Sequence, residues 1–306
     1  MSAMRQDPSH RSGPAGWSRV RAAGEGPERE AGGVLSVVVP AKNEAASLPQ
    51  LVDEIAEALR PLCDARGGVG HRLDGFEIVI VDDGSTDETP SVLRQLAMAY
   101  PELRPLSLLR NVGQSAATAA GFRAARGDWV ATLDADLQNH PADLAALWAA
   151  LPGYDAALGW RSKREDVWSK RVISRCANRV RNQVLGQSIR DTGCSVRIFP
   201  REMALRLPMF HGCHRFFGPL LLREGCRIVQ LPVTHRPRPH GRSHYNLWNR
   251  SLRVIVDLFG VAWLMRRPTR YEVAAEAASA PLPCPGPGPS HASSTAPARR
   301  GIGLEV

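Results

Sequence analysis

Apolar runs alternate with helical patterns along the first half of this chain. The runs VLSVVVP (34–40) and FEIVIVD (76–82) are typical of parallel strands buried on both faces. A helix pattern follows the first run, with Ser47 as its expected N-cap. After the second run, Ser85 and Glu88 fit a capping box. Further strands are predicted at 104–110, 129–134 and 154–160, and further helices at 115–126 and 141–151. This alternation predicts a doubly wound, mostly parallel α/β sheet over residues 34 to 160.

Polar side chains follow two of the predicted strands at the point where each ends. Asp82 and Asp83 close the second strand, while Asp134, Asp136 and Gln138 come at every second position after the fourth. In an extended segment these three side chains point to one side. Ligands of such sheets bind outside the carboxyl ends of the strands. Crowded carboxylates at that edge predict a hard divalent cation, Mg²⁺ or Mn²⁺.

Composition adds a basic balance and limits the alternatives. The 306 residues carry a net charge of +9, which favours a polyanionic partner such as nucleic acid, an anionic membrane or a phosphorylated substrate. The six cysteines form no Cys-x-x-Cys pair and no signal-peptide pattern opens the chain, so we expect a cytoplasmic protein. Glycine-rich phosphate loops with Lys-Ser or Lys-Thr and the Gly-x-Ser-x-Gly elbow are missing, which disfavours P-loop kinases and serine hydrolases.

Four sequence blocks resemble the successive signatures of family-2 glycosyltransferases. They are VVVPAKNEAASLP, IVIVDDGSTDET, LLRNVGQSAATAAGFRAARGD and LDADLQNHP. The chain is similar in particular to the polyprenyl-phosphate, dolichol-phosphate mannosyltransferase-like group, over roughly residues 34 to 270. The resemblance implies a nucleotide-diphospho-sugar transferase (GT-A) type of fold with C-terminal amphipathic helices.

The resemblance also implies roles for individual residues. The implied nucleotide-sugar-binding residues are Pro40, Glu44, Asp82, Asp83, Asp134, Arg197 and Ser243. Asp82 would hydrogen-bond the base, and Asp134 would lie near the ribose. Asp136 and Gln138 would ligate the Mg²⁺ or Mn²⁺ that neutralises the leaving diphosphate.

Arginines complete the implied catalytic set of Asp136, Arg161 and Arg238. Arg161 follows the fifth strand, where it would help to hold the acceptor. The stretch RPHGRSHY, which begins at Arg238 and contains Ser243, resembles a family loop that closes over the donor phosphates. Bidentate arginine suits phosphate oxygens, so we expect phosphate binding there.

Two segments predict contact with a membrane surface. Residues 167–185 form an amphipathic pattern with a basic face, which is equally typical of a helix packed on the domain. Residues 252–265 are apolar with flanking arginines but shorter than the ~20 residues of a span. The expected organisation is a structureless segment at 1–33, a glycosyltransferase domain at 34–245, an interfacial helix at 246–273 and a structureless tail at 274–306.

The resulting expectation is an inverting glycosyltransferase at the inner face of the plasma membrane. It would move a sugar from a nucleotide-diphosphate sugar, with uridine or guanosine as the base, to a polyprenyl phosphate. A phosphate acceptor is largely ionised at neutral pH and needs no base. The only Glu-Asp pair after the fifth strand, Glu165–Asp166, is flanked by cations. The alternatives are the same fold acting on a glycan or glycolipid hydroxyl, and a non-enzymatic polyanion-binding protein. No nucleic-acid partner is expected, since aromatic residues do not interleave with the basic ones.

Overall fold

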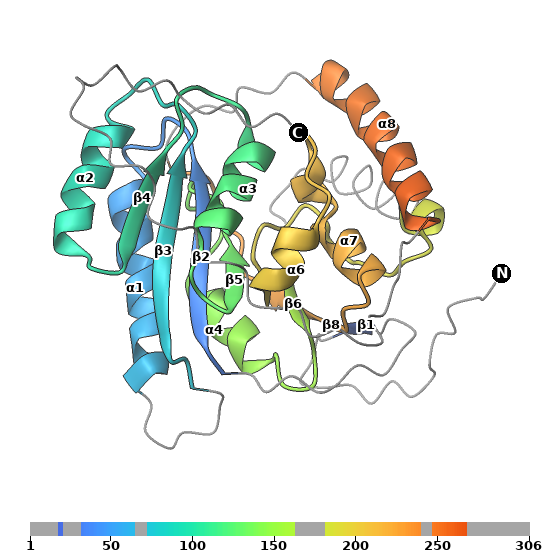
Figure 1. The fold of residues 1–306 in the computed structure, drawn as a ribbon, viewed down its shortest axis with the longest axis horizontal. Coiled ribbons are helices and arrows are strands. Elements are labelled where there is room, and N and C mark those ends of the chain that lie inside the picture. The colour runs from blue at the N-terminus through green and yellow to red at the C-terminus, as the bar shows by residue number, and fades with distance from the viewer. Residues whose placement is uncertain (1–17, 21–31, 65–71, 163–180, 240–246, 268–306) are drawn as a thin grey trace, which may run out of the picture. The chain divides into compact units, whose positions relative to one another are not determined.

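A mixed eight-stranded sheet carries the site, in the order β1-β8-β6-β7-β5-β2-β3-β4 (Figure 1). The computed structural model describes residues 18–20, 32–64, 72–162, 181–239 and 247–267. The strands are β1 (Ser18–Val20), β2 (Val34–Ala41), β3 (Gly75–Asp82), β4 (Leu103–Ser107), β5 (Trp129–Thr132), β6 (Ala156–Arg161), β7 (Arg197–Pro200) and β8 (Ile228–Val233). Residues Met1–Pro268 form one compact unit.

The parallel half of the sheet confirms the sequence prediction. Strand β2 pairs in parallel with both β3 and β5, and β3 pairs in parallel with β4. The other half contains two strands that the pattern did not predict. Strand β7 runs antiparallel between β5 and β6, and β8 pairs in parallel with β6. In addition, β1 pairs antiparallel with β8, within the first 33 residues where we predicted no element.

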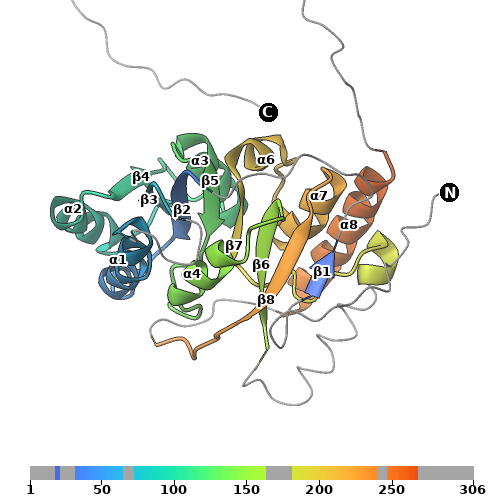
Figure 2. The same cartoon turned by 90° about the horizontal axis from the view of Figure 1, so that it is seen from below.

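Helices cover both faces of the sheet (Figure 2). Helices α1 (Leu48–Asp64), α2 (Thr89–Ala99) and α4 (Ala142–Ala149) lie on one face, and α3 (Gln114–Ala124), α6 (Arg201–Arg206) and α7 (Phe217–Arg223) lie on the other. The short 3₁₀ helix η1 is Cys213–Arg215, and the last described helix is α8 (Leu247–Met265). This layered arrangement confirms the predicted α/β class.

Strand β2 is buried on both faces, as its continuous apolar run predicted. Val37 and Val39 pack into the core beneath α1 and α4, while Val38 packs into the core beneath α3. Each buried side chain of this size contributes roughly 1.5–3 kcal/mol. Helix α3 approaches the sheet closely because Gly121 faces Val38, where an added Cβ would overlap the valine side chain.

The predicted capping box of the second helix is wrong. Helix α2 begins at Thr89, and Glu88 at its N-cap makes no side-chain capping hydrogen bond. Ser85 instead lies in the β3–α2 loop, where its N–H donates to Asp82 Oδ1 over 2.9 Å. Ser85 therefore takes part in the loop at the rim of the sheet and does not cap the helix.

The two predicted amphipathic segments are described to different extents. Residues 167–180 of the first lie outside the described residues, and residues 181–185 are helical. The second is contained in α8, so its helical pattern is confirmed. Across the part of the chain that the structure describes, none of the helices has both the length and the apolar character to cross a membrane.

Candidate functional site at the carboxyl rim of the sheet

Two loops interlock where β2 and β3 end. Asn43, which adopts φ 54°, donates its N–H to Ser85 Oγ over 2.9 Å. Its side-chain Oδ1 accepts the N–H of Thr86 over 2.8 Å. The next residue, Glu44, donates its N–H to Thr89 Oγ1 over 3.0 Å. These long-range bonds fix the backbone of both loops, and so fix where the side chains of the rim point.

Asp82 and Asp83 are both buried, but they have different partners. Asp82 is 2 % exposed, and its Oδ1 accepts the Ser85 N–H. Asp83 is 4 % exposed, and its two oxygens accept the N–H groups of Val112 over 2.7 Å and Gly113 over 2.9 Å. Asp83 therefore holds the loop before α3, whereas Asp82 ends β3 opposite Ala41 of the neighbouring β2.

The acidic segment after β5 is a turn and not a continued strand. Strand β5 ends at Thr132, so the predicted extended geometry of Asp134, Asp136 and Gln138 is wrong. The alternation survives, because these three are partly exposed and the residues between them are buried. The buried residues are Leu133, Ala135 and Leu137. Leu137 has φ 60°, a left-handed conformation that costs a leucine of order 1–3 kcal/mol. Burial of its side chain offsets that strain and keeps the polar residues on the rim.

Asp134 lies in a polar environment built by several elements. Gln114, at the start of α3, donates its Nε2 to Asp134 Oδ1 over 2.8 Å. Burial raises the pKa of the Asp134 carboxyl, and neighbouring Asp136 raises it further. The Ser195 hydroxyl and the guanidinium groups of two arginines act in the opposite direction. The carboxyl is thus poised between repulsion by Asp136 and attraction by cations from the second half of the chain.

Those two arginines are Arg161 and Arg197, both predicted site residues. Arg161 makes a bidentate pair with Asp191, through Nε over 2.7 Å and Nη2 over 3.1 Å. Arg197 is 5 % exposed and donates Nη2 to the Thr192 carbonyl over 2.9 Å. Its guanidinium also lies 5.3 Å from the centre of the Phe217 ring. Both guanidinium groups lower the pKa of Asp134 by their charge.

A segment that follows β8 lies along the acidic turn; we call residues 234–239 the strap. Its residue His235 forms an antiparallel bridge with Asn139. The N–H of Arg236 donates to the carbonyl of Gln138 over 2.8 Å. The strap therefore brings residues more than ninety positions away beside the predicted metal ligands.

Two ion pairs join the strap to α1 and to the loop after β2. Arg236 pairs with Glu54 of α1, with Nη1 and Oε1 3.0 Å apart. Arg238 donates Nη2 to Oε1 of Glu44. Burial raises the pKa of the Glu44 carboxyl, Arg238 lowers it, and Asp136 raises it again. Glu44, Arg238 and Asp136 are consequently brought together at one place. Ser243 lies outside the described residues.

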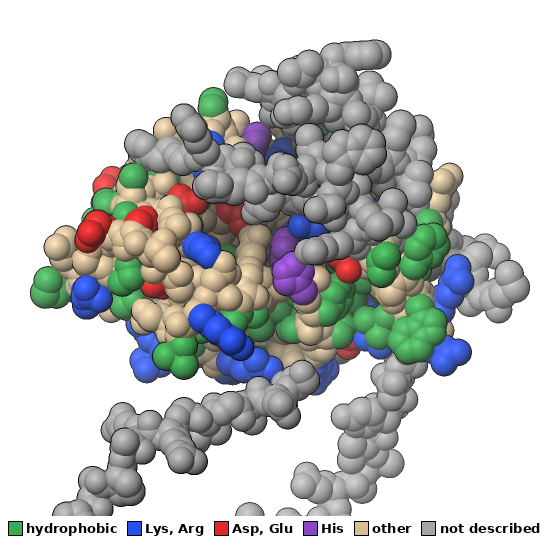
Figure 3. Space-filling view, turned by 90° about the horizontal axis from the view of Figure 1, so that it is seen from above, with side chains coloured by type: hydrophobic (Ala, Val, Ile, Leu, Met, Phe, Trp, Pro, Cys, Tyr) green, Lys and Arg blue, Asp and Glu red, His purple; other side chains and the backbone are tan. Residues whose placement is uncertain are grey.

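Sequence reasoning missed the N-terminus of α3 as a part of the site. Besides Gln114, Ser115 bonds to His214, with Oγ and Nδ1 2.8 Å apart, and accepts the Gly212 N–H over 3.0 Å. In the view onto this rim, acidic, basic and histidine side chains are exposed near one another (Figure 3). The spacing of Gln114 carried no signal, because its partner Asp134 is 20 positions away.

The described polar side chains of this rim do not form a closed metal cage. Within the described ranges there is no group of three or more His, Cys, Asp or Glu side chains arranged to hold a metal ion. Mg²⁺ commonly takes only one or two protein carboxylates and completes its shell with phosphate oxygens and water. Asp136 with the Gln138 amide fits that pattern.

Comparison with known sequences identifies a family model and two informative relatives. The model described as Glycosyl transferase family 2 matches residues 36–207. A dodecaprenyl-phosphate galacturonate synthase of Rhizobium johnstonii is 36% identical over 77% of this chain and 68% of its own length. An undecaprenyl-phosphate 4-deoxy-4-formamido-L-arabinose transferase of Edwardsiella ictaluri is 38% identical over 77% of this chain and 69% of its own length.

Two solved structures share the fold. The mannosyltransferase PcManGT of Pyrobaculum calidifontis, in complex with GDP-Man and Mn²⁺, has a TM-score of 0.51 and 25% identity over 75% of this chain and 64% of its own. The glucosyl-3-phosphoglycerate synthase of Mycobacterium tuberculosis, with Mn²⁺, UDP and phosphoglyceric acid, has a TM-score of 0.54 and 22% identity over 75% of this chain and 78% of its own.

Proposed function

Because the chain belongs to glycosyltransferase family 2, we propose that it moves a sugar, with inversion, from a nucleotide-diphosphate sugar to a polyprenyl phosphate. The observation that carries the proposal is the rim where Asp136 lies close to Glu44, Arg238 and Asp134. The relatives named for transfer to dodecaprenyl and undecaprenyl phosphate support the acceptor class. The family assignment also removes the non-enzymatic alternative.

The donor nucleotide is assigned to the side of the rim formed by β2 and β3. Asp82 has one carboxylate oxygen on a backbone N–H, and its other oxygen is available to a base N–H. Pro40 lies one position before Ala41, the residue of β2 that pairs with Asp82. Asp83 keeps a positioning role, since both its oxygens already bind the loop before α3.

A divalent cation, Mg²⁺ or Mn²⁺, would be held by Asp136 and Gln138. When bound, it would neutralise charge that develops on the leaving diphosphate. Around it, Asp136 accepts the N–H of Gln138 over 3.2 Å, which keeps both side chains on the same turn. Arg238 is close enough to Glu44 and its acidic neighbours to supply a second positive charge to the phosphates.

The acceptor needs cations more than it needs a base. A phosphomonoester with a second pKa near ~6 is largely dianionic at neutral pH, so no proton has to be removed before attack. Arg161 has two of its five N–H donors on Asp191, which leaves the others for an acceptor phosphate. A hydroxyl acceptor would instead need a carboxylate or histidine in reach.

The acceptor lipid requires the enzyme to work at a membrane. We assign it to the inner face of the plasma membrane as a peripheral protein, supported by the net charge of +9 and by the exposed apolar residues of α8. Salt should weaken the electrostatic part of this contact, because exposed charges are screened over ~8–10 Å at physiological ionic strength.

Calorimetric titration tests the donor half of the proposal. UDP and GDP are titrated into the protein with Mn²⁺ and again with excess chelator. We expect one of the two nucleotides to bind, at least tenfold more weakly in chelator. Binding of neither nucleotide under either condition would contradict the proposed function.

A further inference from the structure

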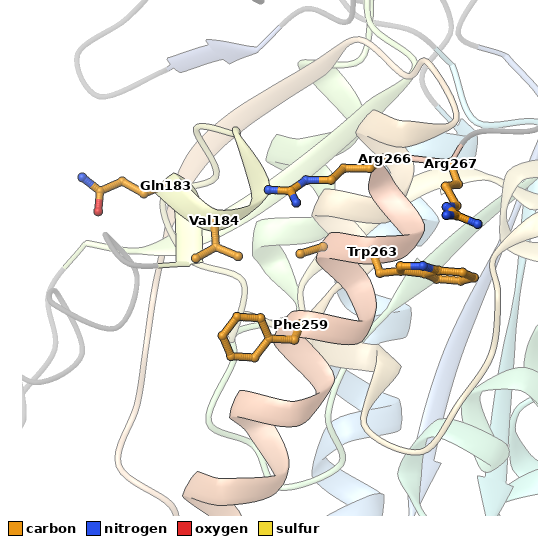
Figure 4. A pocket seen from close by; sticks show the side chains of 7 residues that line it. Gln183, Val184, Phe259, Trp263, Arg266 and Arg267 are labelled. Atoms are coloured by element: carbon orange, nitrogen blue, oxygen red, sulfur yellow. The ribbon is translucent and has the colours of Figure 1, made fainter. Parts of the chain in front are cut away.

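A groove of about 470 Å³ lies away from the rim, between helical residues 181–185 and α8 (Figure 4). Its lining residues are Gln183, Val184, Phe259, Ala262, Trp263, Arg266 and Arg267. Val184, Phe259 and Ala262 give it an apolar wall, and the Arg266 side chain extends from α8 toward the other helix (Figure 4). The volume lies within the range of ~300–1,000 Å³ typical of ligand sites.

The same helix carries an exposed apolar stripe. Val256, Phe259 and Trp263 are 64 %, 64 % and 59 % exposed, at positions i, i+3 and i+7 of α8. Exposed apolar area of this kind, bordered by charge, marks an interaction surface. Figure 3 shows a hydrophobic patch flanked by basic side chains on the side of the molecule where α8 lies.

Two arginines close the C-terminal end of the groove. The Arg267 guanidinium lies 5.2 Å from the centre of the Trp263 ring, a cation–π distance. Arg266 and Arg267 are both exposed. A soluble anion would use these charges but leave Phe259 and Trp263 in water. A neutral apolar ligand would cover the rings but leave the charges unused.

A ligand that satisfies both features has an anionic head and a hydrocarbon chain. We propose that the groove holds one anionic phospholipid of the bilayer, with its phosphate at Arg266 and Arg267 and an acyl chain against Val184, Phe259 and Ala262. Tryptophan beside arginine is typical of the membrane interface, where an aromatic ring meets the headgroups. The inference rests on the proposed membrane contact and adds to it a site for a lipid that takes no part in the reaction.

Vesicle co-sedimentation with a charge-matched control tests whether Arg266 and Arg267 bind the lipid phosphate. The full chain is mixed with vesicles of phosphatidylglycerol and phosphatidylcholine in equal parts. Arg266→Gln/Arg267→Gln should lower the partition coefficient about 30-fold, because each basic residue at an anionic surface contributes roughly fivefold. Arg94→Gln/Arg123→Gln removes the same charge from exposed positions of α2 and α3 and should lower it less than threefold. Equal losses in both pairs, or no binding by the unaltered chain, would overturn the proposal.

A larger side chain in the groove tests whether the groove holds an acyl chain. Ala262→Phe adds apolar area yet should weaken binding at least fivefold, since the space for the acyl chain is lost. If α8 only inserts its exposed apolar face into the bilayer, Ala262→Phe should bind vesicles equally well or more strongly. That result would overturn the proposed lipid site in the groove. If Ala262→Phe lowers the melting temperature, Val184→Glu serves instead, because its carboxylate would pair with Arg266 and repel a phosphate. A dimer of the unaltered chain that dissociates on Ala262→Phe would assign the groove to a second copy.

These binding measurements need neither donor nor acceptor. Loss of sugar transfer with intact vesicle binding would count against the proposed function alone. Normal transfer to a short-chain acceptor with no groove-dependent binding would count against the lipid site alone.

Discussion

Arg238 and Glu44, 194 positions apart in the sequence, form an ion pair across the rim of the sheet. The pair joins the strap to the loop that follows β2. It also brings a guanidinium beside the acidic turn, since Asp136 is close enough to raise the pKa of Glu44. We interpret Glu44 as the residue that positions Arg238 for the donor phosphates, rather than as a direct contact of the base.

Substitution of Glu44 by Gln should therefore act through Arg238. The neutral amide keeps one hydrogen bond but loses the charge that holds the guanidinium. We expect the KM for the nucleotide sugar to rise about tenfold, equivalent to ~1.4 kcal/mol, with a smaller change in kcat. The control is Glu54→Gln, which loosens Arg236 at the other ion pair and leaves Arg238 in place. An unchanged KM in Glu44→Gln with a large loss in Glu54→Gln would contradict this assignment.

Asp136→Asn should abolish most transfer while the fold persists. The residue is partly exposed on a turn, so its replacement leaves the core intact. The amide is a weaker ligand for a hard cation, and we expect a loss of 10²-fold or more in kcat. The measurements are transfer rate over a Mn²⁺ titration and the thermal midpoint. Full activity of the unaltered enzyme in excess chelator would refute a role for the metal.

Gln114 should orient Asp134 through its amide. Gln114→Glu would place a second carboxylate 2.8 Å from the first and lower kcat more than Gln114→Met, which only removes the donor. The pH dependence of kcat separates the two effects. The glutamate variant should shift the acidic limb of the profile upward, because a like charge raises the pKa of Asp134 further. Identical profiles for both variants would leave Gln114 with a packing role only.

The ionisation of Glu77 should make the free energy of unfolding depend on pH. Its carboxylate accepts the Ser36 hydroxyl and the Arg126 N–H, both over 2.6 Å, and pairs with Arg104. Although burial alone would raise the pKa of Glu77, these partners together lower it. A lowered pKa in the folded state gives stability that is present above the unfolded value, near ~4.3, and is lost as pH falls through the folded value.

The corresponding variant is Glu77→Gln. We expect a loss of about 2 kcal/mol in the free energy of unfolding at pH 7, because Arg104 loses its charged partner. The loss should shrink as pH falls below ~4.3, because the unfolded chain then takes up a proton that the folded carboxylate resists. Glu57→Gln on the exposed side of α1 is the control and should change stability by less than ~0.5 kcal/mol. Denaturant unfolding at pH 7 and pH 3.5 makes the comparison.

The sequence predicted the parallel half of the sheet well because that half is built from local signals. Apolar runs such as 34–40 give strands wherever they are covered on both faces. Strand β7 carries Arg197 at its start and is four residues long, so it has neither length nor alternation to reveal it. Its antiparallel place between β5 and β6 depends on tertiary packing.

The site shows the same division between local and long-range information. Asp82, Asp134 and Asp136 were predicted at the rim because they end a strand or follow one within four residues. The bidentate pair of Arg161 with Asp191 and the contact of Gln114 with Asp134 join distant segments, and no local pattern encodes them. The alternation of polar and buried residues after β5 was predicted correctly. Its predicted cause, an extended strand, was wrong, because the segment is a turn that contains a left-handed Leu137.

A direct comparison of two acceptors tests sugar transfer to a lipid phosphate. Radiolabelled UDP- and GDP-sugars are incubated with the full chain, Mn²⁺ and either undecaprenyl phosphate or undecaprenol in detergent. We expect labelled lipid from the phosphate and at least 10²-fold less from the alcohol, with Glu165→Gln and Asp166→Asn still active. Transfer to the alcohol but not to the phosphate, or inactivity of either acidic variant with the fold intact, would contradict it and favour a hydroxyl acceptor.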